Sequence, residues 1–116
     1  MEFLLDIKRF FRFKKRDVLF IWQRLTRGFD DSETWSLDST MARFICPRLK
    51  RFKEIDFGIP STLTEEEWAI ILDKMIFTFE FISSNDYYDP LFLNMNSSKI
   101  EEGLQLFSKY YMNLWW

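Results

Sequence analysis

Apolar and polar residues alternate at helical spacing in four stretches of the chain, and the clearest follows residue 64. Its apolar positions recur at intervals of four, three and four residues: Trp68, Leu72, Met75 and Phe79. Such positions share one face of a helix. Thr64 precedes this stripe and predicts an N-cap, with Glu67 as the partner residue of a capping box. We therefore expect an amphipathic helix that begins just after Thr64.

A second stripe runs through the C-terminal stretch, at intervals of four, three, four and three residues: Ile100, Leu104, Phe107, Tyr111 and Leu114. Ser98 with Glu101 predicts the start of this helix. Residues 83–95 are expected to form a loop, because Asp89–Pro90 is a turn signal. Gly103 lies inside the helix and weakens it, so we expect another backbone or a ligand close to that glycine.

Residues 2–27 are also predicted to be helical, either as one helix or as two segments that meet near Lys14–Asp17. Gly28 is expected to end this helix by adopting the left-handed conformation. This is the most basic stretch of the chain. A basic, aromatic, amphipathic helix is typical of a membrane-surface or nucleic-acid-contacting arm. It is equally typical of a packed helix with a basic polar face, which is the default interpretation.

The central stretch, residues 35–54, has an apolar stripe of its own: Met41, Ile45, Leu49 and Phe52. Ser36 or Asp38 can cap this helix, and Pro47 predicts a kink or a pause inside it. The acidic residues just before it suit a helix start and lack the spacing of a calcium loop: Asp30, Asp31 and Glu33. A kinked helix with basic flanks can line a concave surface, so this helix is the candidate binding site.

Together the four stretches predict an all-α fold, a small helical bundle of four to five helices with a proline-kinked central helix. Three glycines and three prolines are too few for a turn-rich β sandwich. We expect one domain over residues 1–116, with a basic aromatic arm at 1–28 and a helical core at 29–116.

The amino-acid composition excludes several classes of catalytic and metal site. The chain has no His and one Cys, which excludes the usual zinc ligand sets and every His-dependent triad. Cys46 is expected to be a small buried hydrophobe rather than a nucleophile. We therefore expect neither an enzyme nor a cofactor. With no apolar run of the ~18–20 residues that span a bilayer and no disulfide pair, the sequence predicts a cytoplasmic protein.

The net charge of −2 conceals an uneven distribution. Residues 1–53 carry 13 Lys and Arg against 7 Asp and Glu, whereas residues 54–116 carry 3 against 11. The two halves can pair within the fold or head to tail with a second copy, and the basic half can also meet phosphates. The many aromatic residues fit either a core or an interface. Pairing of the halves within the fold is the default interpretation of the charge, and a homo-oligomer is expected in addition.

Three segments resemble a widespread family of small uncharacterised proteins from tailed bacteriophages: WSLDSTMARFICPRLKRFKE, LTEEEWAIILDKMIFTFE and KIEEGLQLFSKYYMNLWW. The shared marks are W-x-L-D, P-R-L-K-x-F-K, E-E-W-x-x-I-L-D-K-M-I and E-G-L-x-L-F-x-K-Y-Y. The resemblance covers residues 28–82 and 97–116 and leaves the basic arm outside. Each shared motif consists mainly of residues expected in the core. The resemblance therefore indicates the fold and a phage origin more than it indicates an activity.

Some small phage proteins counter host antiviral defence, so the resemblance implies a non-enzymatic protein that sequesters a nucleotide-derived immune signal in the infected bacterial cell. The alternative is an adaptor or inhibitor that binds a host defence or replication protein. For phosphate the chain offers Arg43, Arg48, Lys50, Arg51 and Lys53. For base stacking it offers Trp35, Trp68, Tyr87, Tyr88, Tyr110 and Tyr111, with Asp38 as a hydrogen-bond acceptor.

Two of these assignments have a structural alternative, because Trp35 and Trp68 also fit as core anchors. Binding of nucleic acid through residues 8–27 ranks below both protein and nucleotide binding, since the isoelectric point of about 5.2 is acidic.

Overall fold

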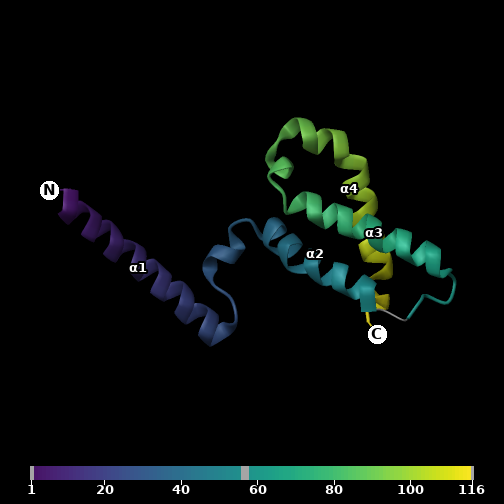
Figure 1. The fold of residues 1–116 in the computed structure, drawn as a ribbon, viewed down its shortest axis with the longest axis horizontal. Coiled ribbons are helices and arrows are strands. Elements are labelled where there is room, and N and C mark those ends of the chain that lie inside the picture. Colours follow the sequence, from purple (N-terminus) through teal and green to yellow (C-terminus); the bar gives the residue numbers. More distant parts are fainter. Residues whose placement is uncertain (1, 56–57, 116) are drawn as a thin grey trace. The chain divides into compact units, whose positions relative to one another are not determined.

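The computed structural model describes residues 2–55 and 58–115, and for residues 2–14 it describes the backbone alone. This part of the chain contains α-helices and short 3-10 helices and no strand (Figure 1). In chain order they are α1 (Glu2–Arg27), η1 (Asp31–Thr34), α2 (Leu37–Ile55), α3 (Glu65–Ile82), η2 (Asn85–Tyr88), α4 (Pro90–Tyr110) and η3 (Tyr111–Asn113). The predicted all-α class is confirmed. Among the described residues, no helix is both long enough and apolar enough to cross a membrane.

The chain divides into two compact units, residues 1–37 (unit 1) and residues 38–116 (unit 2). The sequence had suggested one domain with an arm that ends at residue 28. The boundary lies later because the segment after α1 folds back onto α1. Gln23 of α1 donates a 2.8 Å hydrogen bond to Asp31, and its side-chain oxygen accepts the backbone N–H of Asp31 at 2.8 Å. Arg24 pairs with Asp30 at 2.9 Å.

Unit 1 is built on α1, which is one continuous helix rather than two segments. It ends as predicted at Gly28, whose φ of 86° is the left-handed conformation that glycine adopts at little cost. The backbone N–H of Gly28 donates to the carbonyl of Arg24 at 2.9 Å. The spacing of Leu4, Ile7 and Phe11 also predicts an apolar stripe in the first half of this helix, and these side chains lie outside the described residues.

The acidic residues before α2 act in helix-start chemistry, as predicted, but for η1 rather than for α2. Asp30 accepts the backbone N–H of Ser32 at 2.9 Å, and the carboxylate of Glu33 accepts the backbone N–H of Asp30 at 2.6 Å. This reciprocal pair is a capping box. Asp30 is buried, with 2% of its surface exposed, because both its side chain and its backbone are engaged.

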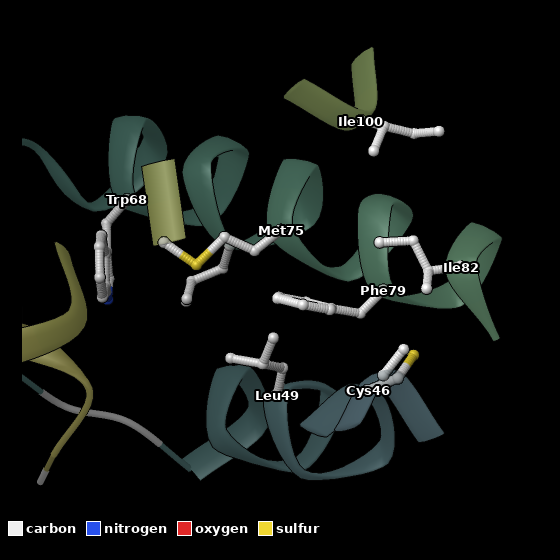
Figure 2. Close-up of a cluster of buried hydrophobic side chains, with 9 residues drawn as sticks. Cys46, Leu49, Trp68, Met75, Phe79, Ile82 and Ile100 are labelled. Carbon is white, nitrogen blue, oxygen red and sulfur yellow. The ribbon is translucent and has the colours of Figure 1, made fainter. Parts of the chain in front are cut away.

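Unit 2 contains the hydrophobic core, to which α2, α3 and α4 all contribute (Figure 2). Its buried members are Ala42, Cys46, Leu49, Trp68, Leu72, Met75, Phe79, Ile82 and Ile100. The predicted stripe of α3 is buried throughout. In Figure 2, Cys46 and Leu49 of α2 point toward Phe79 of α3. Burial of these side chains is the main stabilising contribution to this unit.

The core-facing side of α2 differs from the predicted stripe. Met41 is exposed, whereas Ala42 and Cys46 are buried beside Leu49. The buried face of α2 is therefore turned by about one residue from the predicted stripe, or ~100°. α2 continues through Pro47 without a pause.

The start of α3 is capped as predicted, and the start of α4 is not. Thr64 accepts the backbone N–H of Glu67 at 3.2 Å. α4 begins at Pro90, because Asp89 accepts the backbone N–H of Leu91 at 3.0 Å. The prediction of a loop over residues 83–95 is therefore wrong for most of that range, which consists of η2 and the first turns of α4.

Helices α3 and α4 lie side by side (Figure 1). Gly103 of α4 lies at this contact, against Thr78 and Lys74 of α3. A Cβ atom at this position would stand 1.8 Å from Thr78 Oγ1 and 2.9 Å from the backbone oxygen of Lys74. The predicted close approach of another backbone is confirmed. Thr78 is buried there and donates a 3.2 Å hydrogen bond to the carbonyl of Lys99.

Candidate functional site

Three of the five basic residues of α2 are neutralised by carboxylates of unit 2. Lys50 lies 3.6 Å from Glu80, and Lys53 contacts Asp73, so both lysines face α3. Arg51 pairs with Glu54 of its own helix at 2.9 Å. All of these pairs are on the surface, where each contributes ~0–1 kcal/mol. They reduce the positive potential that a phosphate group would meet at α2.

Arg43 and Arg48 differ from the other three, because neither has a carboxylate partner among the described residues. Arg43 donates to the hydroxyl of Thr40 at 3.3 Å. Arg48 lies over the ring of Phe44, with its guanidinium carbon 3.7 Å from the ring centroid, and donates to the carbonyl of Phe44 at 2.8 Å. Pro47 has no backbone N–H, so the carbonyl of Arg43, one residue before Phe44, lacks its usual helical donor.

The predicted stacking residues are divided between the two units. Trp35 belongs to unit 1, where it is 63% exposed and has Arg16 over its ring at 4.6 Å. Its alternative role as a core anchor is therefore wrong. Trp68 is buried in the core of unit 2, with Tyr110 at its edge and ring centroids 5.6 Å apart. Tyr111 is exposed beside α2.

Asp38 is engaged by a neighbouring tyrosine. Tyr87 donates a 2.7 Å hydrogen bond to the Asp38 carboxylate, which also accepts the backbone N–H of Ser39. The hydrogen bond from Tyr87 is the main cause that lowers the pKa of Asp38, and the same bond raises the pKa of Tyr87. Next to it, the hydroxyls of Tyr88 and Ser39 lie 2.7 Å apart. These two side-chain contacts connect η2 with the start of α2.

The described residues of unit 2 form an apolar groove of about 370 Å³ between α2, α3 and the C-terminal end of α4. It is lined by Thr40, Met41, Phe44, Ile45, Phe79, Phe107 and Tyr111. We name it the α2–α4 groove. Phe44 is 59% exposed although it is a large aromatic side chain. Since Arg48 lies over the Phe44 ring, a guanidinium group without a carboxylate partner lies next to an apolar depression.

A second depression, of about 310 Å³, lies between α3 and α4 and is lined mainly by charged side chains. Lys74 pairs with Glu102 across it at 2.7 Å, and Lys99 lies over the ring of Phe77 at 5.4 Å. Lys74 and Glu102 neutralise each other, and Asp73 pairs with Lys53 of α2, so three of the four charged side chains in this depression have ionic partners.

The described residues show no group of three His, Cys, Asp or Glu that could hold a metal ion. Burial raises the pKa of the Cys46 thiol, and a protonated, buried thiol is a poor nucleophile. Cys46 is part of the core, as predicted.

Sequence reasoning identified Arg48 and Tyr111 but missed the side chains between them. Met41 had been assigned to the core stripe, and Phe44 had no assigned role. A signal was present, since Phe44 lies one helical turn before Arg48 on the same face. No family model, curated protein or solved structure matches the chain.

Proposed function

We propose that this chain is a non-enzymatic protein-binding module whose α2–α4 groove receives an apolar side chain of a partner protein. The observation that carries the proposal is the groove itself, where exposed apolar side chains line a depression of about 370 Å³. Exposed apolar surface that is rimmed by polar groups is typical of protein interaction sites.

The chemistry of the groove also specifies features of the partner. Aromatic residues, Met and Arg are the side chains enriched in the centres of protein interfaces, and Phe44, Met41 and Arg48 supply one of each. Arg48 can pair with a carboxylate of the partner without releasing an ion pair in this chain. The partner segment would therefore present an aromatic or aliphatic anchor next to an Asp or Glu.

The resemblance to small phage proteins supports a bacterial setting for this binding. In that setting the partner is a host defence or replication protein, and the chain acts as its adaptor or inhibitor by covering a surface. A shared pattern and origin alone do not determine function, so the groove remains the physical basis of the proposal.

The test compares two exposed apolar positions of unit 2. The tagged full chain is used as bait in bacterial lysate, next to the variants Phe44→Glu in the groove and Leu91→Glu outside it. Both side chains are exposed, so both variants should keep the melting temperature of the wild type. We expect a stoichiometric partner to be captured by the wild type and by Leu91→Glu, and to be lost with Phe44→Glu. Equal capture by all three proteins would contradict the proposal.

A second candidate function, sequestration of a nucleotide-derived immune signal, is favoured by the stacking of Arg48 on Phe44. A base can insert between the rings of Phe44 and Tyr111, which both line the groove, while Arg48 binds a phosphate. In this form the nucleotide site uses only Arg48 and Tyr111 of the predicted ligand residues. The ion pairs of Lys50, Arg51 and Lys53 disfavour the larger site.

Calorimetry with a panel of cyclic dinucleotides and ADP-ribose derivatives separates the two functions. Sequestration predicts that the wild type binds a compound and that Arg48→Ala weakens this binding by about tenfold or more. Lys53→Ala is the matched control, because Lys53 faces Asp73. Native mass spectrometry of the same samples reports bound mass and the number of copies. Heat signals from none of the compounds would leave protein binding as the function.

A further inference from the structure

The apolar face of α1 is left uncovered by the rest of unit 1. Its described members recur at intervals of four and three residues: Val18, Trp22 and Leu25. All three are exposed, and Leu25 is 81% exposed. Further toward the N-terminus the sequence places Phe11, Ile7 and Leu4 on the same helical face, at intervals of seven, four and three residues, with Lys14 at the position between Val18 and Phe11. A stripe of this length has the pattern of a helix that buries one side against another surface.

The segment after α1 packs on the opposite face. Its contacts with α1 are made by Arg16, Phe20, Gln23, Arg24 and Arg27. Successive helical residues are ~100° apart, so Phe20, Gln23 and Arg27 lie on the side away from Val18, Trp22 and Leu25. The fold of unit 1 thus uses the polar face of α1 for its own contacts and leaves the apolar face available.

The charge of α1 indicates what covers this face. Residues 1–27 contain eight Lys and Arg against three Asp and Glu, and six of the eight lie between residues 8 and 16. Such a net positive charge of 5 opposes parallel pairing of α1 with a second copy of itself. It attracts an anionic surface.

We propose that α1 binds an anionic phospholipid surface, with its axis in the plane of the interface. An amphipathic helix with Lys and Arg on its polar side and Trp, Phe and Leu on its apolar side is suited to the boundary between headgroups and acyl chains. Trp22 on the exposed face fits this depth, where indole rings are favoured. A nucleic acid would contact the basic residues but would leave the apolar face in water. An anionic lipid surface can contact both the basic side and the apolar face of α1.

The test is flotation of the full chain with vesicles of phosphatidylcholine alone or with about 30% phosphatidylglycerol. We expect binding to the anionic vesicles only, and a loss of binding as salt rises from about 0.05 M to about 0.5 M. Leu25→Glu removes an apolar side chain from the exposed face and should lower the partition coefficient by about tenfold or more.

Leu19→Glu is the matched control, because it makes the same change on the same helix at the border of the polar side and should lower the partition coefficient by about threefold at most. Quenching of Trp22 by brominated lipid supplies an independent measurement. The quenching should largely disappear in Trp22→Phe.

Three results would overturn the proposal: no binding to anionic vesicles, equal losses for the two glutamate variants, or a dimer in solution that Leu25→Glu alone dissociates. The last result would assign the face to a second copy of the chain. None of these outcomes depends on the α2–α4 groove.

Discussion

The two compact units bury opposite kinds of side chain. Unit 1 buries Asp30 and Gln23 in hydrogen bonds and leaves Val18, Trp22 and Leu25 of α1 exposed. Unit 2 buries an apolar cluster around Met75, which is 0% exposed, and leaves its charged residues at the surface. Unit 2 therefore contains the conventional core of the protein.

This difference indicates where each unit obtains its stability. Apolar burial contributes ~25 cal/mol per Å², whereas a hydrogen bond contributes about 1 kcal/mol net. In proteins most of the stability of a helix comes from packing of its apolar face. Unit 2 packs the apolar faces of its helices in its own core, whereas the proposed lipid surface would supply that packing for α1. The contrast supports a binding role for α1.

The largest expected difference between the units is in the free energy of unfolding after an apolar side chain of each unit is truncated to alanine. Met75→Ala should lower the free energy of unfolding by about 2–5 kcal/mol, because it leaves a cavity in the core. Leu25→Ala should change it by less than about 0.5 kcal/mol, since Leu25 is already in water. Urea titration followed by circular dichroism measures both. Comparable losses would mean that α1 is packed in solution.

A second prediction concerns the crossing of α3 and α4 in unit 2. Gly103→Ala places a Cβ atom 1.8 Å from Thr78 Oγ1 and 2.9 Å from the Lys74 backbone oxygen, so the helices must separate. We expect a loss of about 2–3 kcal/mol in the free energy of unfolding. Gln105→Ala, at an exposed position of α4, is the control and should be neutral within about 0.5 kcal/mol. A neutral Gly103→Ala would show that the two helices are further apart.

The smallest expected effect is the pH dependence of unit 1. The hydrogen bond from Ser32 is the main cause that lowers the pKa of Asp30 below its ordinary value of 3.8. A carboxyl group with a lowered folded-state pKa stabilises the fold fully above its ordinary pKa, and this contribution is lost as the pH falls through the folded-state value. Unit 1 should therefore loosen below about pH 4.

Hydrogen exchange measured by mass spectrometry, with intrinsic rates corrected for pH, tests this dependence. Protection of residues 28–36 should fall between about pH 4 and pH 2, while the α3 core amides stay protected. In Asp30→Asn the dependence should be weaker, with a remainder from Asp31, whose pKa Arg27 and Gln23 lower. A fall of the same size in α3 would indicate that the acid response belongs to the whole chain.

The sequence predicted the elements whose signals are local. The stripe of α3 and its Thr64 cap are present as expected, and Gly28 ends α1. The start of α4 was missed because Asp89–Pro90 has two interpretations. The pair marks a turn, but it also fits a helix start, where Asp caps and Pro occupies the first position. Only the packing of α4 on η2 and α3 distinguishes the two.

Only part of the α2–α4 groove involves residues that the sequence singled out. Tyr111 lines the groove, and Arg48 lies over Phe44, which also lines it; their role in binding stays a prediction. The neutralisation of Lys50 and Lys53 was not predictable, because Glu80 and Asp73 come from another helix. The role of Phe44 depends equally on its distance from α4, which spacing along one helix does not contain.

By itself the sequence determined the all-α class, the stripe of α3 and the lack of histidine chemistry, since each depends on residue type or on neighbours within a few turns. The tertiary structure decided which face of α2 is buried and which cations remain without a carboxylate partner. It also decided that the segment after α1 packs on the polar face of α1. These properties arise from contacts between helices, where volume and charge must match across positions distant in the chain. For that reason the groove and the exposed face of α1 became visible only in the folded protein.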